Sequence, residues 1–257
     1  MPLGMQASSG VMARSLARAL DPVLLAREAS IEPDEWQAGV LRSAANQILL
    51  LCSRQSGKST VTALLAVHRA LSRAPGLVLL LAPALRQSQE LFREVKSILG
   101  SLANVPRILQ ESALSLEFTT GSRIVCLPGK EATIRGFSAV DLLVVDEASR
   151  VPDDLYAAVR PMLAVSGGRI VLLSTPFGQR GFFHHEATRG GSTWERVKVT
   201  AHSCPRIDPK WLEEERQAIG DWIYRQEYLC EFVSTDDTVF SHDLIMAALD
   251  PTVQPFF

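Results

Sequence analysis

Residues 48–60 constrain the fold of this chain more than any other part of its sequence. Four apolar residues at positions 48–51 lead into a polar turn that ends in Gly-Lys-Ser-Thr at positions 57–60, and a helix-like segment follows at residues 61–72. Strand, tight turn and helix N-terminus in this order form the context in which backbone N–H groups bind phosphate. The stretch therefore predicts a P-loop.

The chemistry of a P-loop assigns a role to each polar residue of the turn. The Lys58 ammonium would reach the β- and γ-phosphates of a nucleotide, and the Ser59 hydroxyl would ligate Mg²⁺. The strict motif has a glycine five residues before Gly57, where this chain has Cys52. Taken alone, the turn could also be a chance Gly-Lys-Ser where a strand meets a helix. The residues expected to contact the nucleotide here are Ser53, Arg54, Gln55, Ser56, Gly57, Lys58, Ser59 and Thr60.

A second phosphate-site signature lies 88 residues beyond Lys58, where an apolar run at residues 142–145 ends in Asp146 and Glu147. A strand of this kind delivers an acid to the Mg²⁺ that the P-loop serine holds, a role that suits Asp146. Glu147 is placed to polarise an attacking water as general base. The alternative is a strand that ends in two acids by chance, but the pair of motifs is more specific than either alone.

The spacing of apolar residues predicts an α/β fold. Alternating strands and helices indicate a mostly parallel sheet with helices on both faces, and residues 114–118 and 123–127 read as an added antiparallel hairpin. Further strands are expected at residues 77–81, 169–174 and 194–200, and helices at residues 11–29, after Asp34, and at 85–99, 153–165, 181–188, 209–219, 221–232 and 242–249. The polar signals at residues 52–60, 146–147 and 174–175 all fall at strand carboxyl ends, where such sheets bind ligands.

Composition bounds the partners. A net charge of −2 and a pI near 6.2 give no global basic field, so any nucleic-acid contact needs a local patch, with arginine as the more frequent cation. Four cysteines without a CxxC pair indicate a reducing compartment. We find no signal peptide and no apolar run that could span a bilayer.

The sequence around the P-loop resembles large terminase subunits, the DNA-packaging motors of tailed phages and prophages. That family tolerates loss of the first P-loop glycine and carries Arg-Gln in the loop, as Arg54-Gln55 does here. Trp36-Gln37 resembles the family's adenine-contacting motif. Asp146-Glu147-Ala148 resembles its Walker B acid and catalytic glutamate, and Ser174-Thr175-Pro176 its coupling motif. The resemblance covers nearly the whole chain.

The resemblance also implies an arginine finger. Ile134-Arg135-Gly136 is similar to the segment that carries a finger into a neighbouring subunit, and Arg135 is expected to act there in trans. Arg54 is a second candidate for contact with the transition state, or for phosphate binding or gating. A solvated loop arginine is the alternative for Arg135.

The resemblance implies a P-loop NTPase of the ASCE or RecA-like type that hydrolyses ATP with Mg²⁺ to translocate double-stranded DNA into a procapsid. Its expected partners are DNA, a homo-oligomeric ring on a portal protein and the small terminase subunit, in the cytoplasm of an infected or lysogenic bacterial host and without a membrane. We expect an N-terminal extension with short helices over residues 1–30, of which 1–10 lack regular structure. The ATPase core is expected over residues 31–205, and a helical lid with a linker over 206–257. Nuclease activity is not expected, because the family's nuclease carboxylates are not found.

Two other functions fit the same motifs. Asp-Glu-Ala-Ser resembles the Walker B of helicase-type, DEAD-like translocases, which need a second RecA-like domain. A non-hydrolytic ATP-binding scaffold is the other, although Lys58, Asp146 and Glu147 argue against it.

Overall fold

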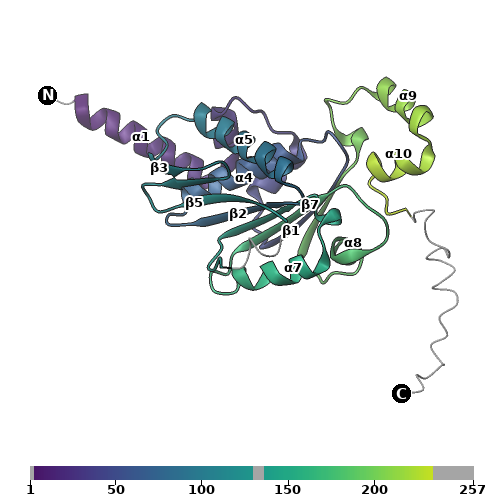
Figure 1. The fold of residues 1–257 in the computed structure, drawn as a ribbon. Helices are drawn as coiled ribbons and strands as arrows, with labels where there is room; N and C mark the ends of the chain where they lie inside the picture. Colours follow the sequence, from purple (N-terminus) through teal and green to yellow (C-terminus); the bar gives the residue numbers. More distant parts are fainter. Residues whose placement is uncertain (1–2, 130–135, 234–257) are drawn as a thin grey trace, which may run out of the picture.

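The computed structural model describes residues 3–129 and 136–233 and shows an α/β fold built on one mixed sheet (Figure 1). Its strands are β1 (Gln47–Cys52), β2 (Leu77–Ala82), β3 (Ile108–Glu111), β4 (Ser115–Phe118), β5 (Arg123–Pro128), β6 (Leu142–Asp146), β7 (Arg169–Ser174) and β8 (Trp194–Val199). Its α-helices are α1 (Leu3–Leu20), α2 (Pro22–Glu28), α3 (Glu35–Arg42), α4 (Lys58–Ser72), α5 (Leu85–Ser101), α7 (Asp153–Val159), α8 (Gly181–Thr188), α9 (Pro209–Ile219) and α10 (Asp221–Glu227). Short 3₁₀ turns are η1 (Ala148–Arg150), η2 (Arg160–Leu163) and η3 (Ala201–Ser203).

The strand order is β3-β4-β5-β2-β6-β7-β1-β8. All neighbouring strands pair in parallel except β4 with β5, which form the predicted antiparallel hairpin, and β3 with β4. Because β7 lies between β1 and β6, the P-loop strand and the acid-bearing strand are about 10 Å apart. Their carboxyl ends lie at the same edge of the sheet, on either side of the end of β7.

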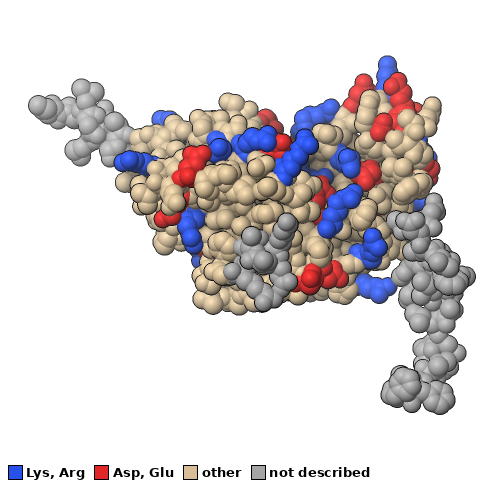
Figure 2. Space-filling view, viewed as in Figure 1, with Lys and Arg blue, Asp and Glu red and all other residues tan. Residues whose placement is uncertain are grey.

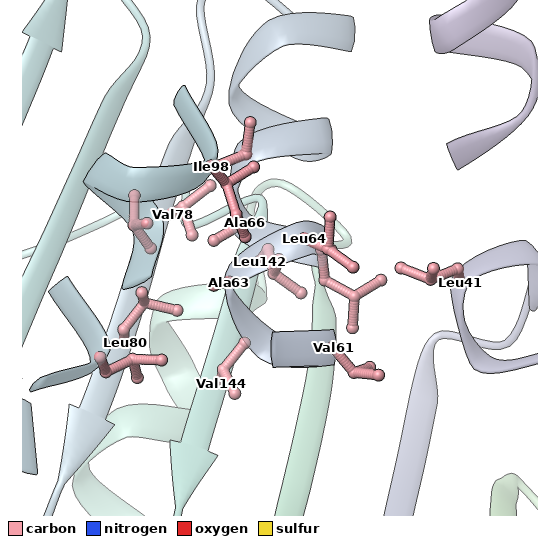
Figure 3. Close-up of a cluster of buried hydrophobic side chains, with 14 of the residues drawn as sticks. Leu41, Val61, Ala63, Leu64, Ala66, Val78, Leu80, Ile98, Leu142 and Val144 are labelled. Carbon is pink, nitrogen blue, oxygen red and sulfur yellow. The ribbon is translucent and has the colours of Figure 1, made fainter. Parts of the chain in front are cut away.

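Apolar side chains bury both faces of the sheet. Helices α4 and α5 cover one face, and α7 and α8 cover the other (Figure 1). In β1, Ile48 and Leu50 join the cluster beneath α4, whereas Leu49 joins the opposite one. Figure 3 shows how the side chains of α4 meet those of β2 and β6. A strand that is buried on both faces is apolar throughout, which is why continuous apolar runs predicted these strands.

Helices α9 and α10 form a smaller unit beside the sheet, with its own buried cluster of Ala201, Leu212, Tyr224 and Tyr228 (Figure 1). The helix predicted at residues 209–219 is confirmed as α9, whereas the helix expected over residues 221–232 ends at Glu227. The expected helix at residues 242–249 lies outside the described residues.

Three sequence expectations were wrong in detail. Residues 3–10 belong to α1, which is one helix of 18 residues and neither short nor irregular. Strand β3 was not predicted; its side chains are all exposed, so it lacks the alternation that marks a half-buried strand. The helix expected over residues 153–165 ends at Val159 and continues as a 3₁₀ turn, because Pro161 has no N–H for the α-helical ladder.

The described residues show three further local features. The carboxylate of Asp21 accepts a hydrogen bond from Val23 N (3.1 Å) and so caps α2, whose first residue is Pro22. Cys52, Cys126, Cys204 and Cys230 are all buried free thiols. In the part of the chain that the structure describes, no helix combines the length and apolar character needed to cross a membrane.

Candidate nucleotide site

The turn between β1 and α4 has the backbone geometry of a phosphate-binding loop. Gln55 and Gly57 both adopt left-handed φ angles, 58° and 91°. A Cβ on Gly57 would lie 2.6 Å from Gln37 Nε2, closer than real Cβ contacts allow. The left-handed φ and this close contact together favour glycine at position 57.

Cys52 replaces the first glycine of the motif without strain. It is the last residue of β1, pairs with Val199 of β8 and is fully buried. Its φ is not positive, so the position does not need glycine. Burial raises the pKa of the Cys52 thiol well above its ordinary value, so the thiol stays neutral.

Lys58 is the first residue of α4, and its ammonium is held by the loop. Lys58 Nζ donates to the carbonyl oxygen of Ser53 (3.1 Å), and Ser56 Oγ donates to the same oxygen (2.9 Å). The Ser53 side chain itself is fully buried. Ser53 therefore acts through its backbone, while the neighbouring Ser59 side chain is exposed at the helix start.

Asp146 and Glu147 lie where β6 ends. Asp146 is buried, and its Oδ1 accepts a hydrogen bond from the backbone N–H of Glu147 (2.9 Å). Burial, together with the negative charge of Glu147, raises the pKa of Asp146 to about 6, against the opposing influence of Lys58. Glu147 has a left-handed φ of 47°, which turns the chain sharply out of the strand.

The end of β7 is linked to Glu147 through hydroxyl groups. Ser174 Oγ donates to Glu147 Oε2 (3.3 Å) and also lies 2.7 Å from Ser149 Oγ. The neighbouring Thr175 is buried. Two of the three motifs that the sequence placed at strand carboxyl ends are therefore in direct contact.

A cavity of about 690 Å³ lies over these residues. Its size falls in the range of small-molecule sites. Beside it is a hollow of about 250 Å³ that shares Ser59 and Glu147 with the cavity and adds Asp146. The cavity is lined by Arg54, Gln55, Ser56, Gly57, Lys58, Ser59, Thr60, Gln87, Glu147 and Arg150.

The donor set suits a hard divalent cation. The Ser59 hydroxyl and the carboxylates of Asp146 and Glu147 line one hollow, and all three offer the oxygen ligands that Mg²⁺ prefers. The structure thus brings the predicted lysine, serine and acids together. Another hollow of about 470 Å³, with Arg42, Arg69 and Arg169 in its wall, lies at the amino ends of β6 and β7, away from this group.

Other predicted residues lie elsewhere. Trp36 and Gln37, both on α3, do not line the cavity. Trp36 packs against the core, and Gln37 is buried with its Nε2 3.3 Å from the carbonyl of Gly57. Ser174 and Thr175 are buried and do not line the cavity, although Ser174 contacts Glu147. Arg135 lies outside the described residues.

Arg54 is held by the α9–α10 unit. Its Nε donates to Glu227 Oε2 (2.6 Å) and its backbone N–H to the carbonyl of Glu227 (3.1 Å). This hydrogen bond raises the pKa of the Arg54 guanidinium. Arg54 both lines the cavity and contacts α10, which gives the loop a physical link to the small helical unit.

Four residues at or beside the cavity carry no local sequence signal. The Arg206 guanidinium donates to the carbonyl oxygen of Ser56 (2.9 Å) and to the carboxylate of Asp34 (2.6 Å). Arg206 therefore links the loop to the residue that precedes α3. Gln87 and Arg150 line the cavity, and Glu227 holds Arg54. Arg206 and Glu227 reach the loop from more than 140 residues away in the chain, a proximity that no motif spacing reveals.

The sequence of this chain matches a known protein family. The family described as terminase large subunit, T4likevirus-type, N-terminal, matches residues 49–246. The large terminase subunits of Thermus virus P23-45 and Escherichia phage T5 are 29% and 24% identical to this chain over 82% and 84% of it. The chain spans about half the length of these curated relatives, 50% and 51%.

Solved structures share the fold. The large terminase ATPase domain of Thermus phage P74-26 has a TM-score of 0.73 at 23% identity, covering 81% of this chain and 97% of that one. The HK97 bacteriophage large terminase has a TM-score of 0.67 at 15% identity, over 80% of this chain and 52% of that one. A DEAD box protein from Methanococcus jannaschii has a TM-score of 0.52 at 16% identity, over 78% and 61%. Because the family match takes in the P-loop, both acids and most of the sheet, this chain belongs to the terminase large subunit family, in its N-terminal part.

Proposed function

We propose that this chain is the ATP-hydrolysing motor domain of a large terminase, which uses Mg²⁺ and ATP to translocate double-stranded DNA into a procapsid. One observation carries the proposal: Lys58 and Ser59 at the start of α4 face Asp146 and Glu147 at the end of β6 across one pair of adjoining hollows. The residues 31–205 would form the ATPase core and the residues from 206 onward a lid and linker.

Each side chain has a defined task. Lys58 would exchange the Ser53 carbonyl for phosphate oxygens, and the loop N–H groups would bind the remaining phosphate charge. Ser59 and Asp146 would hold Mg²⁺, which when bound neutralises charge on the phosphates. Glu147 would accept the proton of the attacking water, with its carboxylate oriented by Ser174 Oγ.

The resemblance assigns Trp36 and Gln37 to contact with adenine, but the hydrogen bonds of Gln37 favour a different role. Gln37 lies beneath the loop, and its Nε2 is bonded to Gly57 O. We therefore propose that Gln37 positions the loop, and that an adenine ring would reach it only if that bond opened.

DNA would be contacted through local arginines. In the view of Figure 2, lysine and arginine side chains are interspersed with acids and form no single continuous basic surface. Because each contact between an arginine and a DNA phosphate releases counterions, binding to duplex DNA should fall steeply with salt. The homo-oligomeric ring on a portal protein, the small terminase subunit and the cytoplasm of a bacterial host are proposed from family membership.

ATP hydrolysis by the purified chain tests the proposal. Wild-type protein should release phosphate only when Mg²⁺ is present, faster at higher protein concentration and with DNA. Lys58→Ala should weaken ATP binding, whereas Glu147→Gln should keep binding and lose turnover. Wild-type turnover by Glu147→Gln would remove the general-base role, and binding without turnover by wild type under every condition would favour the scaffold alternative.

The finger in trans has a separate test. Arg135→Ala and Lys58→Ala subunits should each be inactive alone and partly active when mixed, because each supplies what its neighbour lacks. A mixture that assembles but shows no recovery would contradict Arg135 as the finger.

A further inference from the structure

Three cations from the described residues line the 690 Å³ cavity, and they are held very differently. The Lys58 ammonium donates to Ser53 O, and the Arg54 guanidinium is tied to Glu227 at 2.6 Å. Arg150 is exposed, and its guanidinium lies over the ring of Phe177, 4.2 Å from the ring centroid. An aromatic ring holds a cation weakly and satisfies none of its N–H groups. Arg150 is therefore the cation freest to bind a phosphate oxygen.

Arg150 enters the cavity from the side of the acids. It ends the η1 turn that follows Glu147, and its backbone N–H donates to the carbonyl of Glu147 (2.8 Å). Lys58 enters from the opposite side, at the start of α4. A terminal phosphate between Lys58 and Glu147 would thus have the Arg150 guanidinium next to the general base.

Phe177 connects Arg150 to the end of β7. The ring follows Ser174-Thr175-Pro176, and Ser174 Oγ donates to Glu147 Oε2. Arg180 lies on the same ring, 5.8 Å from its centroid, but does not line the cavity. The segment that orients the general base therefore also sets the position of Arg150.

We propose that Arg150 is a catalytic residue that acts in cis on the terminal phosphate of its own subunit's nucleotide, and that Phe177 is its positioning residue. The inference rests on the proposed ATPase function. In hydrolysis, a water oxygen bonds to the γ-phosphorus as the bond to the bridging oxygen breaks. ADP leaves with that electron pair, and the water proton passes to Glu147. Arg150 would neutralise the charge that develops on the transferring oxygens.

Steady-state ATPase assays on variants of this chain test this role. Arg150→Gln should lower kcat by about tenfold or more with a smaller change in KM, since the charge matters most in the transition state. Arg150→Lys should recover part of the loss. Phe177→Leu should lower kcat about two- to fivefold, and Phe177→Tyr, which keeps the ring, should stay near wild type.

Arg180→Gln is the matched control, because it removes the other guanidinium on the same ring without touching the cavity; its kcat should be unchanged. Action in cis predicts that mixing Arg150→Gln with Lys58→Ala subunits restores nothing. Recovery in that mixture would overturn action in cis. Normal kcat in Arg150→Gln would overturn the inference, whereas an inactive wild type would instead refute the proposed function.

Discussion

The buried carboxyl of Asp146 should make the metal-free protein less stable at neutral pH than a variant with a neutral side chain there. Asp146 is 8% exposed, and its pKa is raised to about 6, first by burial and then by the charge of Glu147. In Asp146→Asn the amide oxygen can still accept the hydrogen bond from Glu147 N. The substitution thus removes the charge and keeps the shape.

The size of the effect follows from proton linkage. An acid whose pKa is higher in the folded state binds more protons there, so stability falls as pH rises from the unfolded pKa of 3.8 to the folded pKa of about 6. Below pH 4 both states are protonated and the penalty is absent. With about 1.4 kcal/mol for each pKa unit, the raised pKa of Asp146 lowers the free energy of unfolding by roughly 1–2 kcal/mol at pH 5 and by about 3 kcal/mol at pH 8.

Urea unfolding of wild type and Asp146→Asn in a chelator, without nucleotide, measures this directly. The free-energy advantage of the variant should roughly double between pH 5 and pH 8, while its ATPase activity disappears. Glu147→Gln should lower the pKa of Asp146 and so reduce the advantage. Asp154→Asn, which alters an exposed acid at the start of α7, should show no such trend.

A variant that is equally stable or less stable at both pH values would refute the reasoning, since it would mean that Asp146 carries no charge penalty in the fold. An advantage that is constant with pH would point to packing and not to charge.

Three further predictions concern the loop, the helical unit and the core. Gly57→Ala should abolish tight nucleotide binding and lower the free energy of unfolding by about 1–2 kcal/mol, because the φ of 91° is left-handed and the new methyl group meets Gln37. Nucleotide titration measures the binding, and urea unfolding measures the stability. Wild-type affinity in the variant would show that the loop adapts. Glu227→Ala should free Arg54 and speed amide exchange in α9 and α10, yet cost no more than about 1 kcal/mol because the Arg54 side chain is 61% exposed; unchanged exchange would mean that the pair does not hold the unit. Leu80→Ala, at a fully buried β2 position, should cost about 2–5 kcal/mol in urea unfolding, and a loss under 1 kcal/mol would mean that the core collapses around the gap.

Local chemistry explains why much of the site was predictable. The P-loop depends on a strand, a left-handed glycine and a helix start, all within about a dozen residues. Likewise, Asp146 and Glu147 lie at the end of an apolar strand that is buried on both faces. Short-range sequence patterns predict such features because the features depend on local backbone conformation.

Local patterns do not reveal the contacts that long-range packing makes. Gln37 resembles a base-contacting residue in sequence, and tertiary packing places its side chain against the carbonyl of Gly57. Exposed strand β3 had no pattern to reveal it.

The sequence alone determined that the chain has a turn of P-loop pattern and a pair of acids, and that each follows directly after a strand of one mostly parallel sheet. Only the tertiary structure decided which other side chains join them, among them Arg150, Arg206 and Glu227. The physical reason is that local patterns fix backbone shape, whereas side-chain partnerships depend on strand order. The packing of the whole chain determines that β7 lies between β1 and β6 and that α10 contacts the loop.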